Sequence, residues 1–150
     1  METLVIGYGN TLRGDDGVGY RLAEIIADWK LRTVKALACH QLTPELAADL
    51  AEVERVIFAD ASLAQNPISA LRLERLEGIC HGIGPLGHHS QPGQILTLSQ
   101  QLYDGQPIAY TLTLPAQRLD YGEQLSPWAR VGLRQAERLL WQLLYLPGSP

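Results

Sequence analysis

The stretch that decides the fold is TLVIGYGNTLRGDDGVG, residues 3–19. It opens with an apolar run, residues 3–8, of the kind found in fully buried strands, and this run ends in a glycine-rich turn. From residue 16 to residue 29, apolar residues recur every three or four positions, which is the spacing of one helical face. The stretch therefore predicts a buried strand, a shaped loop and an amphipathic helix.

The same alternation continues to the end of the chain. Further strand patterns cover residues 33–39, 55–60, 68–76 (an edge strand) and 108–114, with a glycine-rich loop over 77–92. Two helices are predicted to start at Thr43-Pro44 and at Ser126-Pro127, the second running through Leu144, because a capping side chain before proline is typical of a helix start. A further helix is predicted over 93–103, opened by Pro92. The predicted apolar side of the helix over 93–103 is Ile95, Leu96, Leu98 and Leu102. This order predicts one α/β domain over residues 1–150, with a mostly parallel twisted sheet of about five strands and helices on both faces.

Composition narrows the class of partner and the compartment. The 150 residues carry a formal charge of -4 and only 19% charged residues, which gives no broad basic face for nucleic acid or an anionic membrane. The two cysteines, Cys39 and Cys80, have neither CxxC nor zinc-finger spacing. No apolar run reaches the ~18 residues of a membrane span. We therefore expect a cytoplasmic protein without a disulfide framework or a thiolate metal site.

Ligands of such sheets bind in the crevice outside the carboxyl ends of the strands, so the search for a site narrows to residues 7–19, 60–66 and 77–91. Asp16 follows the first strand close to a helix N-terminus, where negative charge is favoured. The plainer alternative makes Asp15 the helix cap and Asp16 an ordinary first-turn acid. Asp60 ends an apolar strand, where it is either functional or caps the next turn.

Two adjacent histidines, His88 and His89, lie in the third loop, where a solvent-exposed histidine without a role is the plainer interpretation. Together with Asp16 and Asp60, however, one imidazole completes a ligand set suited to a divalent first-row metal with open positions for substrate. Neither HExxH nor GxSxG is present, so the sequence indicates no resident zinc and no serine triad. Leu12 replaces the third glycine of a dinucleotide fingerprint, which argues against a nucleotide site.

Four motifs resemble one family, the nickel–iron hydrogenase maturation peptidases. They are the loop of residues 7–19, the strand end Ala59-Asp60-Ala61, the His-x-x-x-Pro of residues 88–92, and Tyr-Gly-Glu-x-Leu-Ser-Pro at 121–127. The resemblance covers essentially the whole chain. HQLTPEL at 40–46 further resembles the branch that serves bidirectional, NAD(P)-linked hydrogenases of cyanobacterial type.

The resemblance implies an endopeptidase that removes a short C-terminal extension from the hydrogenase large-subunit precursor after nickel insertion. By this analogy Asp16, where other members often have Glu, takes the first metal-ligand position, Asp60 the second and His88 the third. His88 has the family's offset to Pro92, although the neighbouring His89 leaves that choice open. Gly9 and Asn10 would shape the first loop, and Asp15 would support it.

The same analogy implies no resident cofactor, with nickel supplied by the substrate and the nickel-loaded precursor as partner. An incomplete ligand set would then act as a checkpoint, because a precursor without nickel offers it nothing to bind. The sequence leaves open whether the metal orients the enzyme, polarises the scissile carbonyl or activates water, and whether Asp16 or Asp60 is a catalytic base. Two other hypotheses are an assembly chaperone that senses the nickel centre without hydrolysis, and a small-anion or nucleotide-binding module.

Overall fold

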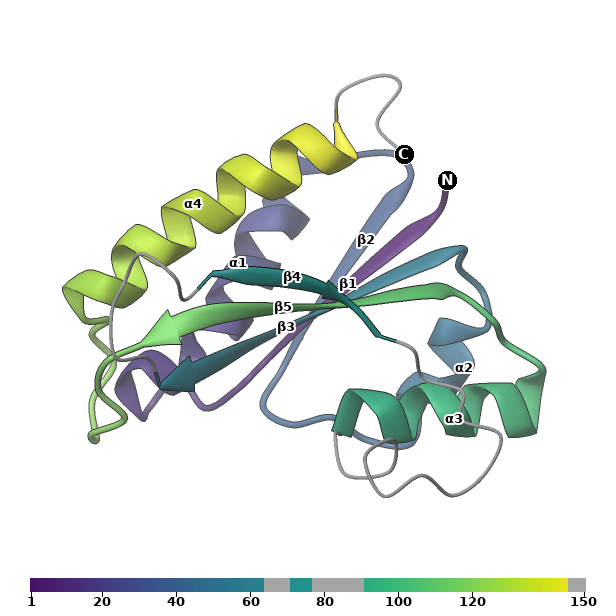
Figure 1. Ribbon diagram of the computed structural model, residues 1–150, viewed down its shortest axis with the longest axis horizontal. Coiled ribbons are helices and arrows are strands. Elements are labelled where there is room, and N and C mark those ends of the chain that lie inside the picture. Colours follow the sequence, from purple (N-terminus) through teal and green to yellow (C-terminus); the bar gives the residue numbers. More distant parts are fainter. Residues whose placement is uncertain (64–70, 77–90, 146–150) are drawn as a thin grey trace.

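The computed structural model describes residues 1–63, 71–76 and 91–145. Its centre is a five-stranded sheet (Figure 1) whose strands lie in the order β2 (Val34–Cys39), β1 (Thr3–Tyr8), β3 (Arg55–Leu63), β5 (Ile108–Ala116) and β4 (Arg72–Arg75). β1, β2, β3 and β5 run parallel, and the short edge strand β4 runs antiparallel to β5. The mostly parallel sheet of about five strands predicted from the sequence is confirmed.

Helices cover both faces of this sheet (Figure 1). α1 (Val18–Trp29) and α4 (Pro127–Leu144) pack on one face, and α2 (Leu46–Leu50) and α3 (Gln91–Tyr103) on the other. Successive strand residues point to opposite faces, so Leu4 and Ile6 enter the core under α2 and α3, whereas Val5 enters the core under α1 and α4. Two covered faces explain why β1 is buried at every position. Within the described ranges, no helix is long and apolar enough to cross a bilayer.

The structure corrects two details of the helices. α2 begins at Leu46 without a side-chain cap, because the amides of Leu46 and Ala47 donate to the carbonyl oxygens of Thr43 and Pro44; the predicted cap by Thr43 is wrong. Leu102 is 62% exposed, against the prediction that it is buried, because the buried residues of α3 end at Ser99 and the last turn has no core beneath it.

The start of the last helix agrees with the sequence. The amide of Ala129 donates to the Ser126 hydroxyl oxygen at 3.2 Å, and Pro127 is the first residue of α4. The first helix differs, because a short 3-10 helix, η1 (Gly14–Gly17), comes before α1 and contains the two acids that the sequence placed next to a helix start. The connection between β1 and α1 therefore contains a 3-10 helix that the periodicity of the sequence did not indicate.

Candidate functional site

Asp16 and Asp60 lie at the same edge of the sheet. β1 and β3 are parallel neighbours in which Gly7 pairs with Ala59; β1 ends one residue later at Tyr8, whereas β3 continues beside β5 to Leu63. Asp60 stands on β3 directly after this pair, and Asp16 lies in η1, where its Oδ2 accepts a hydrogen bond from the Asn10 amide at 2.8 Å. Both side chains are partly buried. The structure thus brings together the two carboxylates that the sequence singled out.

Glycines allow the loop to pack directly on the strands. Gly9 has a φ of +142°, and a Cβ on it would lie 1.9 Å from the Asp16 carbonyl oxygen. A Cβ on Gly19 would lie 2.3 Å from the carbonyl oxygen of Ala59, the residue before Asp60. Only glycine fits such close backbone approaches. The two glycines therefore hold η1 and the start of α1 against the end of β3, which places Asp16 near Asp60.

The environment of Asp60 opposes its negative charge. Its Oδ2 accepts from the Tyr8 hydroxyl at 3.1 Å, and its Oδ1 accepts from the Ala61 amide at 2.7 Å. Burial raises the pKa of Asp60 above its ordinary value, the two hydrogen bonds lower it, and the negative charge of Asp16 raises it again. The contact with Ala61 caps no turn, because Ala61 is the next residue of β3, which continues to Leu63; the strand end predicted at Asp60 and the alternative that Asp60 caps a turn are therefore both wrong.

The negative charge of Asp16 raises the pKa of Asp60, as the smallest of the four contributions to it. A cation at this edge would offset both negative charges, and carboxylate oxygens suit a divalent metal. The carboxylates of Asp16 and Asp60 are therefore suited to a divalent metal ion that another molecule brings to the site.

Tyr8 holds Asp60 from the neighbouring strand. Burial, followed by the charge of Asp60 and the hydrogen bond to it, raises the pKa of Tyr8 far above its ordinary value, so the hydroxyl stays protonated and donates. We expect Tyr8→Phe to raise the pKa of Asp60 further, because the donated hydrogen bond favours the ionised carboxylate. A carbon-13 NMR titration of the aspartate carboxyls measures this shift. The exposed Tyr103→Phe is the control, and an unchanged Asp60 titration in Tyr8→Phe would disprove the role assigned to Tyr8.

A pocket of about 300 Å³ opens beside Asp60. Side chains of three strands and the first two residues of α3 line it: Tyr8, Phe58, Asp60, Gln91, Pro92, Thr111, Leu112 and Thr113. Gln91 is the third residue after His88, so the chain that carries the two histidines rejoins the described structure at the Asp60 pocket.

His88 and its alternative His89 themselves lie outside the described residues. Within residues 1–63, 71–76 and 91–145, no group of three His, Cys, Asp or Glu side chains could hold a metal ion. The predicted set of three metal ligands, Asp16, Asp60 and His88, therefore stays a prediction.

Asp15 is neither a helix cap nor a metal ligand in this arrangement. Its carboxylate is fully buried; Oδ1 accepts from the Ser126 amide at 2.7 Å, and Oδ2 accepts from the amides of Gln117 (2.7 Å) and Arg118 (3.0 Å) and from the Ser126 hydroxyl. The N-cap of α1 is Gly17, which has no side-chain cap bond. The alternative that Asp15 caps the helix is therefore wrong, and the carboxylate instead ties the first loop to the segment between β5 and α4.

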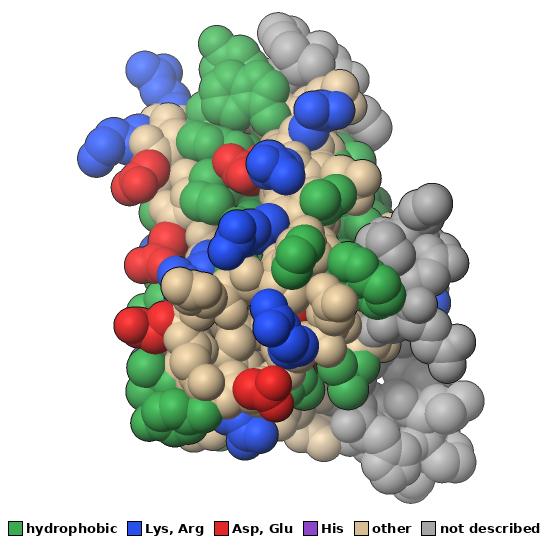
Figure 2. Space-filling model, turned by 90° about the vertical axis from the view of Figure 1, so that its left-hand side faces the viewer, with side chains coloured by type: hydrophobic (Ala, Val, Ile, Leu, Met, Phe, Trp, Pro, Cys, Tyr) green, Lys and Arg blue, Asp and Glu red, His purple; other side chains and the backbone are tan. Residues whose placement is uncertain are grey.

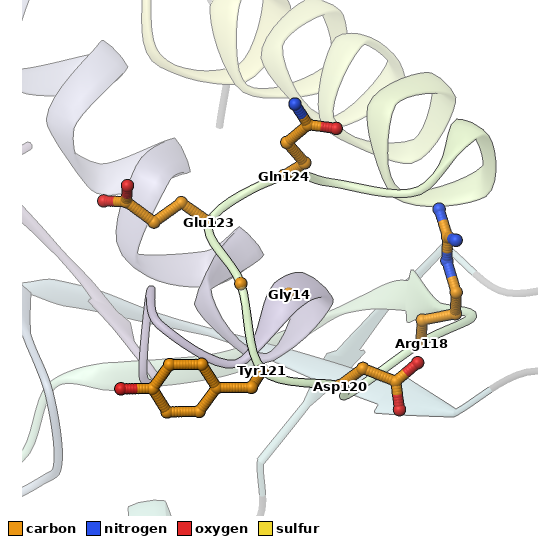
Figure 3. A pocket seen from close by; sticks show the side chains of 7 residues that line it. Gly14, Arg118, Asp120, Tyr121, Glu123 and Gln124 are labelled. Carbon is orange, nitrogen blue, oxygen red and sulfur yellow. The ribbon is translucent and has the colours of Figure 1, made fainter.

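That segment, residues 117–126, forms part of the site architecture that the local sequence pattern did not reveal. Backbone bonds extend the connection made by Asp15: the Gly14 amide donates to the Gly122 carbonyl oxygen, and the Gly122 amide donates to the Leu12 carbonyl oxygen, both at 2.7 Å. Figure 3 shows the segment passing over Gly14, with side chains arranged around a pocket of about 270 Å³. The pocket is lined by Gly14, Arg118, Asp120, Tyr121, Gly122, Glu123 and Gln124. The motif at 121–127 indicated that this segment matters for function, but it did not indicate that Ser126 contacts Asp15.

Cys39 and His40 do not form a nucleophile–base pair. Cys39 is half-buried against the core under α2 and α3, and burial raises the pKa of its thiol, which keeps it protonated. His40 stacks on Tyr20 with ring centroids 5.3 Å apart. Cys39 thus packs as a small apolar residue, as its strand-end position predicts.

Comparison with known proteins identifies the fold. No family model matches the sequence, and no curated protein sequence matches it. Among solved structures, the hydrogenase maturating endopeptidase HybD from E. coli superposes with a TM-score of 0.75 at 21% identity, over 99% of this chain and 94% of that one. The hydrogenase 2 maturation peptidase from a Thaumarchaeota archaeon has a TM-score of 0.70 at 24% identity, over 96% of this chain and 98% of that one. The NiFe hydrogenase maturation protease HycI from Thermococcus kodakarensis has a TM-score of 0.74 at 17% identity, over 97% of this chain and 93% of that one. The chain therefore has the fold of the hydrogenase maturation endopeptidases.

Proposed function

We propose that this protein is an endopeptidase that removes the C-terminal extension of a nickel–iron hydrogenase large-subunit precursor after nickel has been inserted. One observation carries the proposal: Asp16 and Asp60 lie at the same edge of the sheet, and Asp60 borders a pocket that is also lined by Gln91, the third residue after His88. Solved structures of the same fold are named hydrogenase maturation endopeptidases, which supports the choice of reaction.

Nickel belongs to the substrate in this proposal. Asp16, Asp60 and His88 supply two carboxylates and an imidazole, which leave coordination positions open for the ligands that the metal brings with it. The same three residues recognise nothing in a precursor without metal. Processing is therefore coupled to metal insertion.

Hydrolysis adds water to the scissile carbonyl carbon, breaks the carbon–nitrogen bond and transfers a proton to the leaving amine. Asp16 and Asp60 are the candidate proton carriers. Tyr8 holds the Asp60 carboxylate in place during this transfer.

The remaining parts of the proposal rest on the sequence. Residues 40–46 point to the precursor of a bidirectional, NAD(P)-linked hydrogenase as the substrate, and the two isolated cysteines fit the cytoplasm. Neither a nucleic acid nor a membrane is needed as partner.

The test is incubation of the purified protein with a nickel-loaded large-subunit precursor, followed by intact-mass measurement. We expect loss of the C-terminal extension as one peptide. If the protein binds the loaded precursor but leaves its mass unchanged, it is an assembly chaperone and the peptidase proposal is wrong.

A further inference from the structure

One side of α4 presents arginine and aromatic side chains to solvent. The spacing of four, four, three and four residues places Arg130, Arg134, Arg138, Trp141 and Tyr145 on one helical face, which we call the α4 stripe. All five are exposed to solvent, and the exposed fractions of Trp141 and Tyr145 are 38% and 52%. In Figure 2, Lys and Arg side chains follow one another up this side of the molecule, with hydrophobic side chains at its upper end. The opposite face of α4 packs on the sheet through Ala129, Gly132, Ala136 and Leu140.

The aromatic end of the stripe is held in place. Trp141 meets Trp29 of α1 edge-on at 5.0 Å and stacks on Tyr145 at 4.2 Å between ring centroids. A shallow groove of about 410 Å³ lies beside these rings, lined by Trp29, Arg134, Glu137, Arg138 and Trp141. Tryptophan, tyrosine and arginine are the residues that contribute most to binding at protein–protein interfaces. A preordered aromatic anchor flanked by guanidinium groups is therefore suited to a protein partner.

Charge identifies the kind of surface that fits. α4 carries three Arg and one Glu, a formal charge of +2 on a chain whose total is -4. Across the part of the chain that the structure describes, neither Arg134 nor Arg138 forms a salt bridge. A second copy of this chain that presented the same stripe would bring arginine against arginine. A bilayer is disfavoured as well, because the apolar face of α4 is already buried on the sheet.

The N-terminal end of the stripe lies next to the candidate active site. α4 begins at Pro127, directly after its N-cap Ser126, whose amide and hydroxyl donate to Asp15, the neighbour of Asp16 in η1. From this edge the 18 residues of α4 extend about 27 Å along the molecule. A folded protein that inserts a segment between Asp16 and Asp60 meets the Arg130 end of the stripe first, and reaches Trp29 and Trp141 by extending roughly 20 Å along α4.

We propose that the α4 stripe is a docking surface for an acidic patch on the large-subunit precursor, with an apolar side chain of that patch seated against Trp29 and Trp141. This inference rests on the proposed function, since it takes the precursor as the occupant. Charge pairs at the rim of an interface act on encounter and affinity, and their effect weakens as salt rises. The stripe thus contributes to capture of the precursor and not to the chemical step.

The test is steady-state cleavage of the nickel-loaded precursor by Arg138→Glu and Arg134→Glu. We expect each variant to raise KM about tenfold at low salt with kcat within about twofold, and the difference from wild type to shrink as salt rises. The matched control is Lys35→Glu, which makes the same change of charge at an exposed position; Lys35 pairs with Leu4 on the face of the sheet away from α4. If both arginine variants keep the KM of Lys35→Glu, the docking proposal is wrong.

A binding titration separates this proposal from the peptidase proposal. Asp60→Asn, used as a background that does not turn over, is titrated with loaded precursor, and adding Arg138→Glu is expected to weaken binding about tenfold. That result supports docking even if wild-type protein proves not to cleave. Equal binding of the precursor with and without Arg138→Glu overturns docking while leaving the peptidase proposal intact. The same two proteins are also mixed with anionic vesicles. If Arg138→Glu weakens binding to the vesicles and not to the precursor, docking is overturned as well.

Discussion

Asp60→Asn is expected to lower the rate of precursor cleavage by at least about a thousandfold, because in the proposed reaction Asp60 is one of two carboxylates that bind the substrate's nickel and a candidate proton carrier. Asparagine has nearly the same size and still accepts a hydrogen bond from the Tyr8 hydroxyl or the Ala61 amide. The loss therefore reports the charge of Asp60 and not its shape. Initial rates measured with the nickel-loaded precursor check this result.

Stability distinguishes this loss from misfolding. The pKa of Asp60 is raised, so at neutral pH its ionised form opposes folding, and this cost disappears below the ordinary pKa of a carboxyl. Asp60→Asn is thus expected to be at least as stable as the wild type at pH 7. Asp28→Asn, an exposed acid near the end of α1, is the matched control and keeps full activity. If Asp60→Asn retains more than about a tenth of the wild-type rate, Asp60 has no direct part in the reaction.

Asp15→Asn is expected to reduce the free energy of unfolding by about 3 kcal/mol or more. The wild-type carboxylate only accepts hydrogen bonds, and it accepts from three backbone amides and one hydroxyl. The side-chain NH2 group of asparagine would face at least one of these buried N–H groups and leave it without an acceptor. Each buried N–H group without an acceptor costs about 1–3 kcal/mol. Urea unfolding at neutral pH measures the loss.

The same carboxylate makes stability depend on pH. Burial alone would raise the pKa of Asp15, but the hydrogen bonds from Ser126, Arg118 and Gln117 together lower it below its ordinary value. Its stabilisation is therefore complete above the pKa of the unfolded chain, near pH 4, and is lost as the pH falls through the lower pKa of the folded state. Asp15→Asn lacks this component of the acid unfolding.

Asp120→Asn is the control for both measurements, because it makes the same chemical change at an exposed position of the facing segment. It is expected to unfold within about 0.5 kcal/mol of the wild type. Equal stability of Asp15→Asn and Asp120→Asn would mean that Asp15 does not hold the two segments together.

Much of the fold was predictable because it rests on local patterns. β1 is apolar at both alternating sets of positions, which indicates a strand covered on both faces, and the helices that cover it show the expected periodicity. The meeting of Asp16 and Asp60 also followed from the sequence, since parallel neighbouring strands end at one edge. The edge strand was placed correctly, although within the described residues it is confined to Arg72–Arg75.

The features that escaped prediction depend on contacts between distant residues. Asp15 and Ser126 are 111 positions apart, and Tyr8 and Asp60 are 52 apart, so no local pattern marks either pair. The absent cap at Thr43 has a different and local cause, because backbone carbonyls three residues earlier accept the amides that the threonine side chain would have capped. The α4 stripe is visible as spacing in the sequence, but its exposure depends on which face of α4 packs on the sheet.

The most direct test of the central claim compares two precursors of the same large subunit, one loaded with nickel and one free of it, after incubation with this protein. Intact-mass spectrometry follows the C-terminal extension in each. The account predicts that only the nickel-loaded precursor is shortened, since Asp16, Asp60 and His88 recognise the metal that the substrate carries. Shortening of the nickel-free precursor at the same rate would contradict it.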